Sequence, residues 1–333
     1  MYQSKEHSRR QLFKGSIASV VAASWLRATS QAESKPAASR PKWTIACRDA
    51  NLRTLAKANI FSAMEAIDVD GVEVQVELDG SCPNLFEADK KYSIANKKNI
   101  KILGDALRRH KKKITAFCLA NRFDERTEEE VDFVAKTARA AVALGVPAIR
   151  LDIVPRRLKD KEDEFLKFAV ETGRRIIKET NDTKVRFGIE NHGGTTNKPE
   201  FLRKLFKGVG SKRFGLTLDT ANFYWFGHPL SKLYEIYSEF APWVCHTHCK
   251  SIQYPKAEQQ KRRQMGWEYG KYACPIYEGD IDFKRLVAVL NKNSYTGDLC
   301  IENESLSRFP KEQHQSILAR EAAFLRRLLK EIK

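Results

Sequence analysis

Eight short runs of apolar and β-branched residues alternate with amphipathic segments along most of this chain. These runs are predicted strands at residues 43–47, 71–76, 114–120, 148–154, 186–191, 214–219, 243–248 and 298–303. Segments such as EEEVDFVAKTARAAVALG, which lie between them, have helical periodicity. Strands that alternate with helices form parallel sheets, and eight such strands close a (β/α)8 barrel. We therefore predict an α/β fold, a single-domain (β/α)8 TIM barrel over residues 43–333.

A doubly wound open sheet is the alternative arrangement of the same elements. That fold places a glycine-rich phosphate-binding loop after its first strand. Here the first predicted strand is followed by CRDANLR, which contains no glycine. The closed barrel is therefore favoured.

The N-terminal segment has the pattern of an export signal. SRRQLFKGS carries the paired Arg9 and Arg10, an apolar run follows from Gly15 to Leu26, and Ser30-Gln31-Ala32 is a small-x-small cleavage pattern. The run is too short for a hydrocarbon core of roughly 30 Å, so we expect no stable membrane span. We predict a twin-arginine signal peptide at residues 1–32 and a linker at 33–42, with export to the periplasm or cell envelope. A disordered basic tail is the alternative.

The chain is basic, with a formal net charge of +17. Such a surplus is compatible with nucleic acid, an anionic surface or an acidic substrate as partner. The basic clusters RRHKKK and KRR are short, however. We interpret most of the surplus as a solvated outer face and predict no nucleic-acid partner.

Acidic and histidine side chains stand at the ends of the last four predicted strands. In strand order these residues are Glu190, Asp219, His248 and Glu302. The carboxyl ends of barrel strands form the active site, and alternate residues point inward. A single acid at such a position is commonly a helix cap or a surface ion pair, but four on the inward parity can converge. Three carboxylates and one imidazole suit one divalent ion, Mn, Mg, Co or Zn. His246 lies one alternation deeper, where a hydrogen-bonded core residue is expected rather than a ligand.

The segments GIENHGG, LTLDTANF, VCHTHCKS, YEGDIDF and YTGDLCIEN resemble the successive signatures of the xylose isomerase-like TIM-barrel superfamily. Within it they are most similar to the sugar phosphate isomerase/epimerase, or ketose 3-epimerase-like, branch. The resemblance extends from Trp43 to the C-terminus. It implies that the four strand-end residues are metal ligands and that Glu190 and Glu302 also form the acid–base pair. It further implies that Lys250, in the H-x-K motif, contacts the substrate.

The chain departs from the sequence patterns of three groups within the superfamily, and these departures bear on which activity it shares. Many of the epimerases carry a histidine three residues after the strand-six aspartate, where this chain has Asn222. Xylose isomerases proper show Glu-x-Lys on strand five, where this chain has Glu190-Asn191-His192. The DNA endonucleases of the superfamily use extra histidines on strands two and three, and VQVELDG and FCLANRFD offer none. A nuclease is therefore the least favoured member activity.

A divalent ion that chelates neighbouring carbonyl and hydroxyl oxygens of an open-chain ketose stabilises an enediolate. Two carboxylates can then remove a proton and return it. We predict a divalent-metal-dependent sugar isomerase or epimerase with this chemistry. A lyase or dehydratase acting through the same enediolate, and a sugar-binding protein without turnover, are the alternatives.

Two loops add substrate-binding candidates. The aromatic segment NFYWFGHP after the sixth strand contains Trp225, and the long connection Ser251–Gly279 contains Arg262. Connections of such length commonly act as lids or binding loops. A basic lid favours an anionic sugar derivative over a neutral small-molecule sugar, and a contact in a homo-oligomer would explain the connection as well. The expected substrate contacts are His192, Asn222, Trp225, Lys250 and Arg262.

Overall fold

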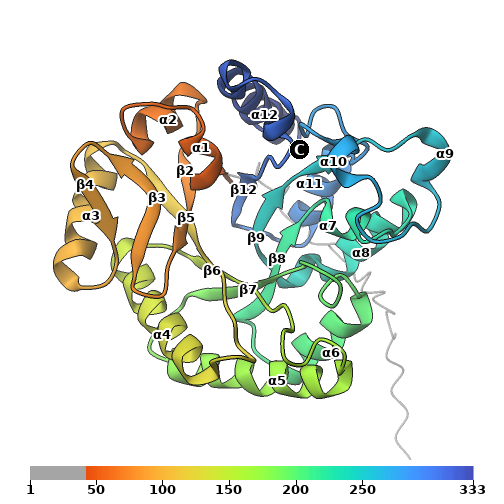
Figure 1. Cartoon of the computed structure of the whole chain (residues 1–333), viewed down its shortest axis with the longest axis horizontal. Helices are drawn as coiled ribbons and strands as arrows, with labels where there is room; N and C mark the ends of the chain where they lie inside the picture. The colour runs from red at the N-terminus through yellow and green to blue at the C-terminus, as the bar shows by residue number, and fades with distance from the viewer. Residues whose placement is uncertain (1–42, 333) are drawn as a thin grey trace, which may run out of the picture. The chain divides into compact units, whose positions relative to one another are not determined.

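Eight parallel strands pair into a closed barrel in the computed structural model, which describes residues 43–332 (Figure 1). In chain order the barrel strands are β1 (Thr44–Arg48), β2 (Gly71–Val76), β5 (Lys113–Leu119), β6 (Ala148–Leu151), β7 (Arg186–Glu190), β8 (Phe214–Asp219), β9 (Val244–Cys249) and β12 (Asp298–Ile301). The ring closes where β1 pairs with both β2 and β12. The predicted single-domain TIM barrel is confirmed. The predicted signal peptide and linker lie outside the described residues.

The longer helices surround the barrel (Figure 1). They are α3 (Lys97–Arg109), α4 (Thr127–Leu144), α5 (Glu162–Glu179), α6 (Pro199–Val209), α8 (Leu230–Phe240), α11 (Phe283–Lys292) and α12 (Lys311–Glu331). Each is amphipathic and buries an apolar stripe, as α6 does with Phe201, Leu202, Leu205 and Phe206. Within residues 43–332, no helix combines the length and apolarity needed to cross a membrane.

Short helices, 3-10 turns and strand pairs lie in the connections between the barrel strands and the longer helices. They include the helices α1 (Asp49–Arg53), α2 (Ile60–Ala66), α7 (Asn222–Trp225), α9 (Lys256–Gln259) and α10 (Tyr269–Tyr272), and the 3-10 turns η1 (Ala241–Trp243) and η2 (Leu306–Arg308). Two antiparallel pairs lie outside the barrel sheet, β3 (Ser81–Glu87) with β4 (Lys90–Ser93), and β10 (Ser251–Ile252) with β11 (Ala273–Cys274). The long connection predicted after the seventh strand therefore starts and ends in one small hairpin-like pair.

The barrel interior is narrow where β7 passes β8 and β9. A Cβ atom on Gly188 would lie 2.3 Å from Thr217 Oγ1 and 2.8 Å from Cys245 Sγ. Only glycine fits there, two residues before the end of β7. This close approach brings the C-terminal residue of β7, Glu190, near the ends of the next two strands.

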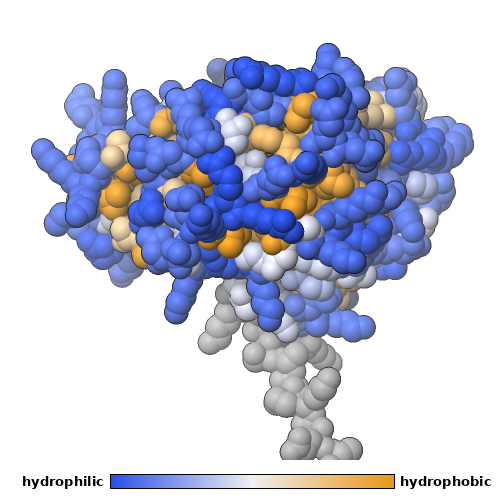
Figure 2. Space-filling view, turned by 90° about the horizontal axis from the view of Figure 1, so that it is seen from below, coloured by the Kyte–Doolittle hydropathy of each residue, from blue (hydrophilic) through white to orange (hydrophobic). Residues whose placement is uncertain are grey.

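The side of the molecule shown in Figure 2 is largely hydrophilic, with apolar residues in the gaps between hydrophilic ones. Among the described residues the exposed large hydrophobic side chains are Ile102, Val142, Trp243 and Met265. The basic residues are spread among acidic partners on the protein surface, for example in the Arg175–Glu128 ion pair between α5 and α4.

Candidate functional site

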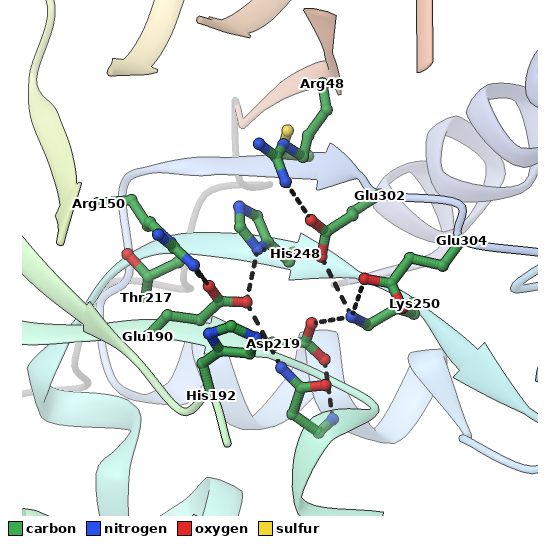
Figure 3. Close-up of polar contacts among 12 residues, drawn as sticks. Arg48, Arg150, Glu190, His192, Thr217, Asp219, His248, Lys250, Glu302 and Glu304 are labelled. Carbon is green, nitrogen blue, oxygen red and sulfur yellow. Dashed lines mark hydrogen bonds and ion pairs between the residues drawn. The ribbon is translucent and has the colours of Figure 1, made fainter. Parts of the chain in front are cut away.

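Four side chains from consecutive barrel strands meet at the carboxyl end of the barrel (Figure 3). Each of these residues, Glu190, Asp219, His248 and Glu302, offers one ligand atom, and the four atoms lie within 4.8 Å of one another. Strand register contributes directly, because Asp219 on β8 is the pairing partner of His248 on β9. All four side chains are buried. The structure thus brings together the set selected from the strand ends.

Two arginines hold the glutamates of this set, each by one oxygen. Arg150 on β6 donates from Nε to Glu190 Oε2 at 2.7 Å. Arg48 at the end of β1 donates to Glu302 Oε1. The second oxygen of each glutamate, Glu190 Oε1 and Glu302 Oε2, faces the common centre, where each lies close to His248 Nδ1.

Asp219 is held in the same way by the backbone. Its Oδ1 accepts hydrogen bonds of 2.8 Å from the N–H groups of Ala221 and Asn222. Its Oδ2 is buried and accepts no hydrogen bond, although the Lys250 ammonium lies 2.8 Å away as an ion pair. Glu302 Oε2 is likewise buried without a hydrogen bond. Each acid is therefore oriented by one oxygen and presents the other.

His248 is oriented by a buried carboxylate from the far side of the barrel. Its Nε2 lies 3.0 Å from both oxygens of Glu73 on β2. When the ring is neutral, as a metal ligand must be, this contact favours the tautomer with the proton on Nε2, which leaves the Nδ1 lone pair for the common centre. His246 also contacts Glu73, from Nε2 at 3.1 Å, and its Nδ1 lies 2.9 Å from Asp298 Oδ1. Both nitrogens of His246 are thus engaged below the site.

Burial and neighbouring charges shift the pKa values of the three acids in different directions. Burial acts to raise the pKa of Glu190, but the positive charges of Arg150 and His248 together outweigh it and hold that pKa below its ordinary value. For Glu302, the charges of His248, Lys250 and Arg48 together outweigh burial, and its pKa is again low. Burial dominates at Asp219 and raises its pKa to about 7. The two glutamates are therefore held ionised.

The presented atoms fit a divalent cation. Such an ion binds carboxylate oxygen and imidazole nitrogen, and metal ligands are typically fixed by hydrogen bonds at their other atom. Here three oxygens and one nitrogen converge, two of the oxygens are buried without a hydrogen bond, and every ligand has an orienting partner. The residues that would hold the ion are Glu190, Asp219, His248 and Glu302.

Comparison with known families agrees with the barrel fold. The model of the xylose isomerase-like TIM barrel family matches residues 61–328. The chain belongs to this family.

Solved structures share the fold at low sequence identity. The IOLI protein, whose structure contains a bound zinc atom, is 15% identical with a TM-score of 0.64, over 85% of this chain and 97% of that one. The 3-keto-D-glucoside 4-epimerase of E. coli is 15% identical with a TM-score of 0.58, over 85% and 100%. The mannonate dehydratase of Streptococcus suis is 11% identical with a TM-score of 0.61, over 86% and 94%. A search of curated proteins gave no match.

A cavity of about 220 Å³ lies beside the proposed ligands of this xylose isomerase-like barrel. Four of the five expected substrate contacts line it, together with two residues that the sequence did not single out. The lining residues are His192, Asn222, Trp225, Lys250, Tyr269 and Glu304. The cavity is therefore the candidate substrate site.

Arg262, the fifth expected substrate contact, lies elsewhere. Its Nη1 is 3.0 Å from His228 Nδ1, and its guanidinium stacks on the ring of Phe226 at 4.9 Å. Arg262 is not among the residues that line the cavity.

Sequence reasoning did not identify Glu73, Arg48 or Arg150, which orient the ligand set. A signal was available for all three. In GVEVQV, Glu73 alternates with valines and shares the inward parity of Gly71 and Gln75. Arg150 stands on the inward parity inside the predicted run 148–154, and Arg48 follows the predicted run 43–47 on the inward parity. Charged residues on the inward parity of barrel strands therefore mark the supports of the site.

Proposed function

We propose that this protein is a divalent-metal-dependent sugar isomerase or epimerase in which Glu190 and Glu302 form the acid–base pair. One observation carries the proposal. In each of the four ligand residues, one polar atom is held by a hydrogen bond within the protein and the other faces a common centre. The presence of epimerases among the similar structures supports the reaction class.

The glutamates are suited to moving a proton at a substrate carbon. Both are held ionised by neighbouring positive charges, so either can accept a proton. The arginine behind each one fixes the position of its presented oxygen, Glu190 Oε1 or Glu302 Oε2. Because they come from β7 and β12, on either side of β8 and β9, they reach the centre from different directions. One can remove a proton and the other can return it, which inverts a carbon centre.

A bound divalent cation would stabilise the enediolate by drawing negative charge from its oxygens. The chain itself excludes water from the acids, because Glu190 and Glu302 are only 3% and 6% exposed. Asn222 at the cavity wall offers an amide donor for substrate hydroxyl oxygens.

The proposal is tested by solvent proton exchange. The purified protein, loaded separately with Mn²⁺, Mg²⁺, Co²⁺ or Zn²⁺, is incubated in D₂O with a panel of ketoses and aldoses. Deuterium incorporation is followed by mass spectrometry and the products by NMR. We expect exchange and a new sugar with wild type, loss of both with Glu190→Gln or Glu302→Gln, and retention with Glu268→Gln, an acid outside the cavity lining. Absence of exchange from every sugar at full metal loading would refute the proposal.

Elimination is the second candidate. A buried ammonium, Lys250 Nζ, lies 3.3 Å from Glu302 Oε2 at the cavity wall and could protonate a departing hydroxyl group. A dehydratase shares the fold. The same experiment separates the two, because elimination releases a dehydrated product instead of an isomer.

A further inference from the structure

The substrate cavity has a charge pattern that bears on what it can bind. Its volume of about 220 Å³ is smaller than the roughly 300–1,000 Å³ of sites for drug-sized ligands, so it has room for one small molecule. Two of its lining residues are cationic or able to become so, Lys250 and His192, and one is a carboxylate, Glu304. Which ligand this wall selects depends on whether those charges are already engaged.

The lysine is fully engaged by carboxylates of the protein. Lys250 Nζ lies 2.8 Å from Asp219 Oδ2, 3.3 Å from Glu302 Oε2 and 3.1 Å from Glu304 Oε1. One ammonium therefore faces three acids, and Glu304, which is not a proposed metal ligand, is the partner that remains when an ion takes the oxygens of Asp219 and Glu302. Its side chain is only 6% exposed, so it has little freedom to turn toward a ligand phosphate.

The histidine is paired as well. His192 Nδ1 lies 3.1 Å from Asp152 Oδ1. The ring therefore already has a carboxylate partner within the protein.

The basic residues of the Ser251–Gly279 connection are turned away. Arg262 contacts His228 and Phe226, as described above. Arg263 is buried between the rings of Tyr224 and Tyr254, 4.5 and 4.4 Å from their centroids. Its guanidinium donates to backbone carbonyls, including that of Tyr224. Neither arginine lines the cavity, so the basic run works as packing within the connection.

Glu304 places a negative charge at the cavity wall. Its Oε2 accepts a 2.6 Å hydrogen bond from Tyr269 Oη, and its side chain is 45% exposed. Phosphate and carboxylate ligands need unmatched cations or bidentate arginines, and like charges at close range oppose binding. A carboxylate instead accepts hydrogen bonds from hydroxyl groups. The Trp225 ring on the same wall can cover an apolar C–H surface.

We propose that Glu304 is a specificity-determining residue that restricts this site to neutral, monosaccharide-sized polyhydroxy compounds and rejects sugar phosphates and uronates. The inference rests on the proposed function for the location of the site. It differs from the expectation of an anionic sugar derivative, which was based on the basic residues of the Ser251–Gly279 connection.

Binding measured without turnover tests this inference. Glu190→Gln protein loaded with Mn²⁺ is titrated calorimetrically with a neutral ketohexose panel, the matching 6-phosphates and the matching uronates. We expect neutral sugars to bind about tenfold or more tightly than their anionic counterparts. Adding Glu304→Gln, which keeps the shape and removes the charge, should reduce this ratio several-fold. Adding Glu268→Gln, which removes a charge from the Ser251–Gly279 connection outside the cavity lining, should leave the ratio unchanged.

Equal or tighter binding of the anionic sugars would overturn the inference, as would binding of no sugar at all. An unchanged ratio in the Glu304→Gln protein would overturn the role of that residue. These outcomes are distinct from failure of the proposed function. If neutral sugars bind without proton exchange, the proposed isomerase or epimerase function is refuted and the selectivity for neutral sugars stands. If exchange is confined to phosphorylated sugars, the proposed function stands and the selectivity is refuted.

Discussion

Replacing Glu73 with glutamine tests whether the site is organised from the far side of the barrel. Glu73 is completely buried, and its oxygens lie 3.0 Å from His248 Nε2, 3.1 Å from His246 Nε2 and 3.0 Å from Arg48 Nε. Glutamine preserves the size of the side chain but has one acceptor oxygen and a donor amide. At least one of the three donors must then face an N–H group. The tautomer of His248 is no longer fixed.

The expected loss can be estimated from the role of such partners. Removing the hydrogen-bond partner of a metal-binding histidine typically weakens metal affinity about 10–100-fold, or roughly 1.4–2.7 kcal/mol. Because Glu73 is ionised and buried, we expect Glu73→Gln to lie in the upper half of this range. Calorimetric titration with Mn²⁺ or Zn²⁺ measures the affinity, and ¹⁵N NMR of the histidine rings shows whether His248 still carries its proton on Nε2.

A matched control is available in Glu321→Gln. Glu321 on α12 is also completely buried, but it accepts a hydrogen bond from Ile276 N and contacts none of the proposed ligands. Metal affinity should be unchanged in that variant. Affinity within about twofold of wild type in Glu73→Gln, with an unaltered His248 tautomer, would refute the reasoning.

Two further predictions concern buried charges. Lys250→Met should tighten binding of a divalent ion about tenfold, because the ammonium lies within 3.3 Å of two presented oxygens and repels a second cation; unchanged or weaker affinity in calorimetry would contradict this. Burial raises the pKa of Glu321 from 4.5 to about 8. The folded state then binds more protons than the unfolded state between these values, so wild type loses stability relative to Glu321→Gln as the pH rises. Urea unfolding measures the free energy of unfolding of both proteins. The difference between them should shift by about 2–3 kcal/mol in favour of Glu321→Gln from about pH 6 to about pH 9. A difference that does not change with pH would exclude the mechanism.

The barrel strands were predictable because local pattern and tertiary role coincide in them. The runs 71–76 and 214–219 were predicted with their observed bounds, and the other barrel strands differ at their ends by up to three residues. The run 148–154 is longer than β6, which ends at Leu151, because only Ala148–Leu151 finds partners in β5 and β7. The β3–β4 hairpin was not predicted. It contains Pro83 and several charged residues, and it forms a separate two-stranded sheet whose other pairing is a single bridge from Glu87 to Asn59.

The site was predictable to the extent that strand parity determines it. Parity places Glu190, Asp219, His248 and Glu302 at one rim, since each lies on the inward side at the end of a strand or within one residue of it. It does not show that Glu73 on β2 reaches His248 on β9, because that contact crosses the barrel and exists only after closure. The placement of Arg262 depends on packing against Phe226 within a long connection, for which no period in the sequence gives a guide.

Burying ionisable groups in the interior of this barrel costs free energy, and this cost bears on why the groups are there. The inward layers of TIM barrels are commonly filled with bulky branched apolar residues. Here a line of ionisable groups, Asp298, His246, Glu73 and His248, runs from the lower part of the barrel to the site, and all are buried. Buried ion pairs contribute little net stability compared with well-packed apolar groups, while removing one partner is strongly destabilising. Stability alone therefore does not account for this network. Its geometry does, because each contact fixes the next one upward and the last fixes the nitrogen of His248 that faces the three acids.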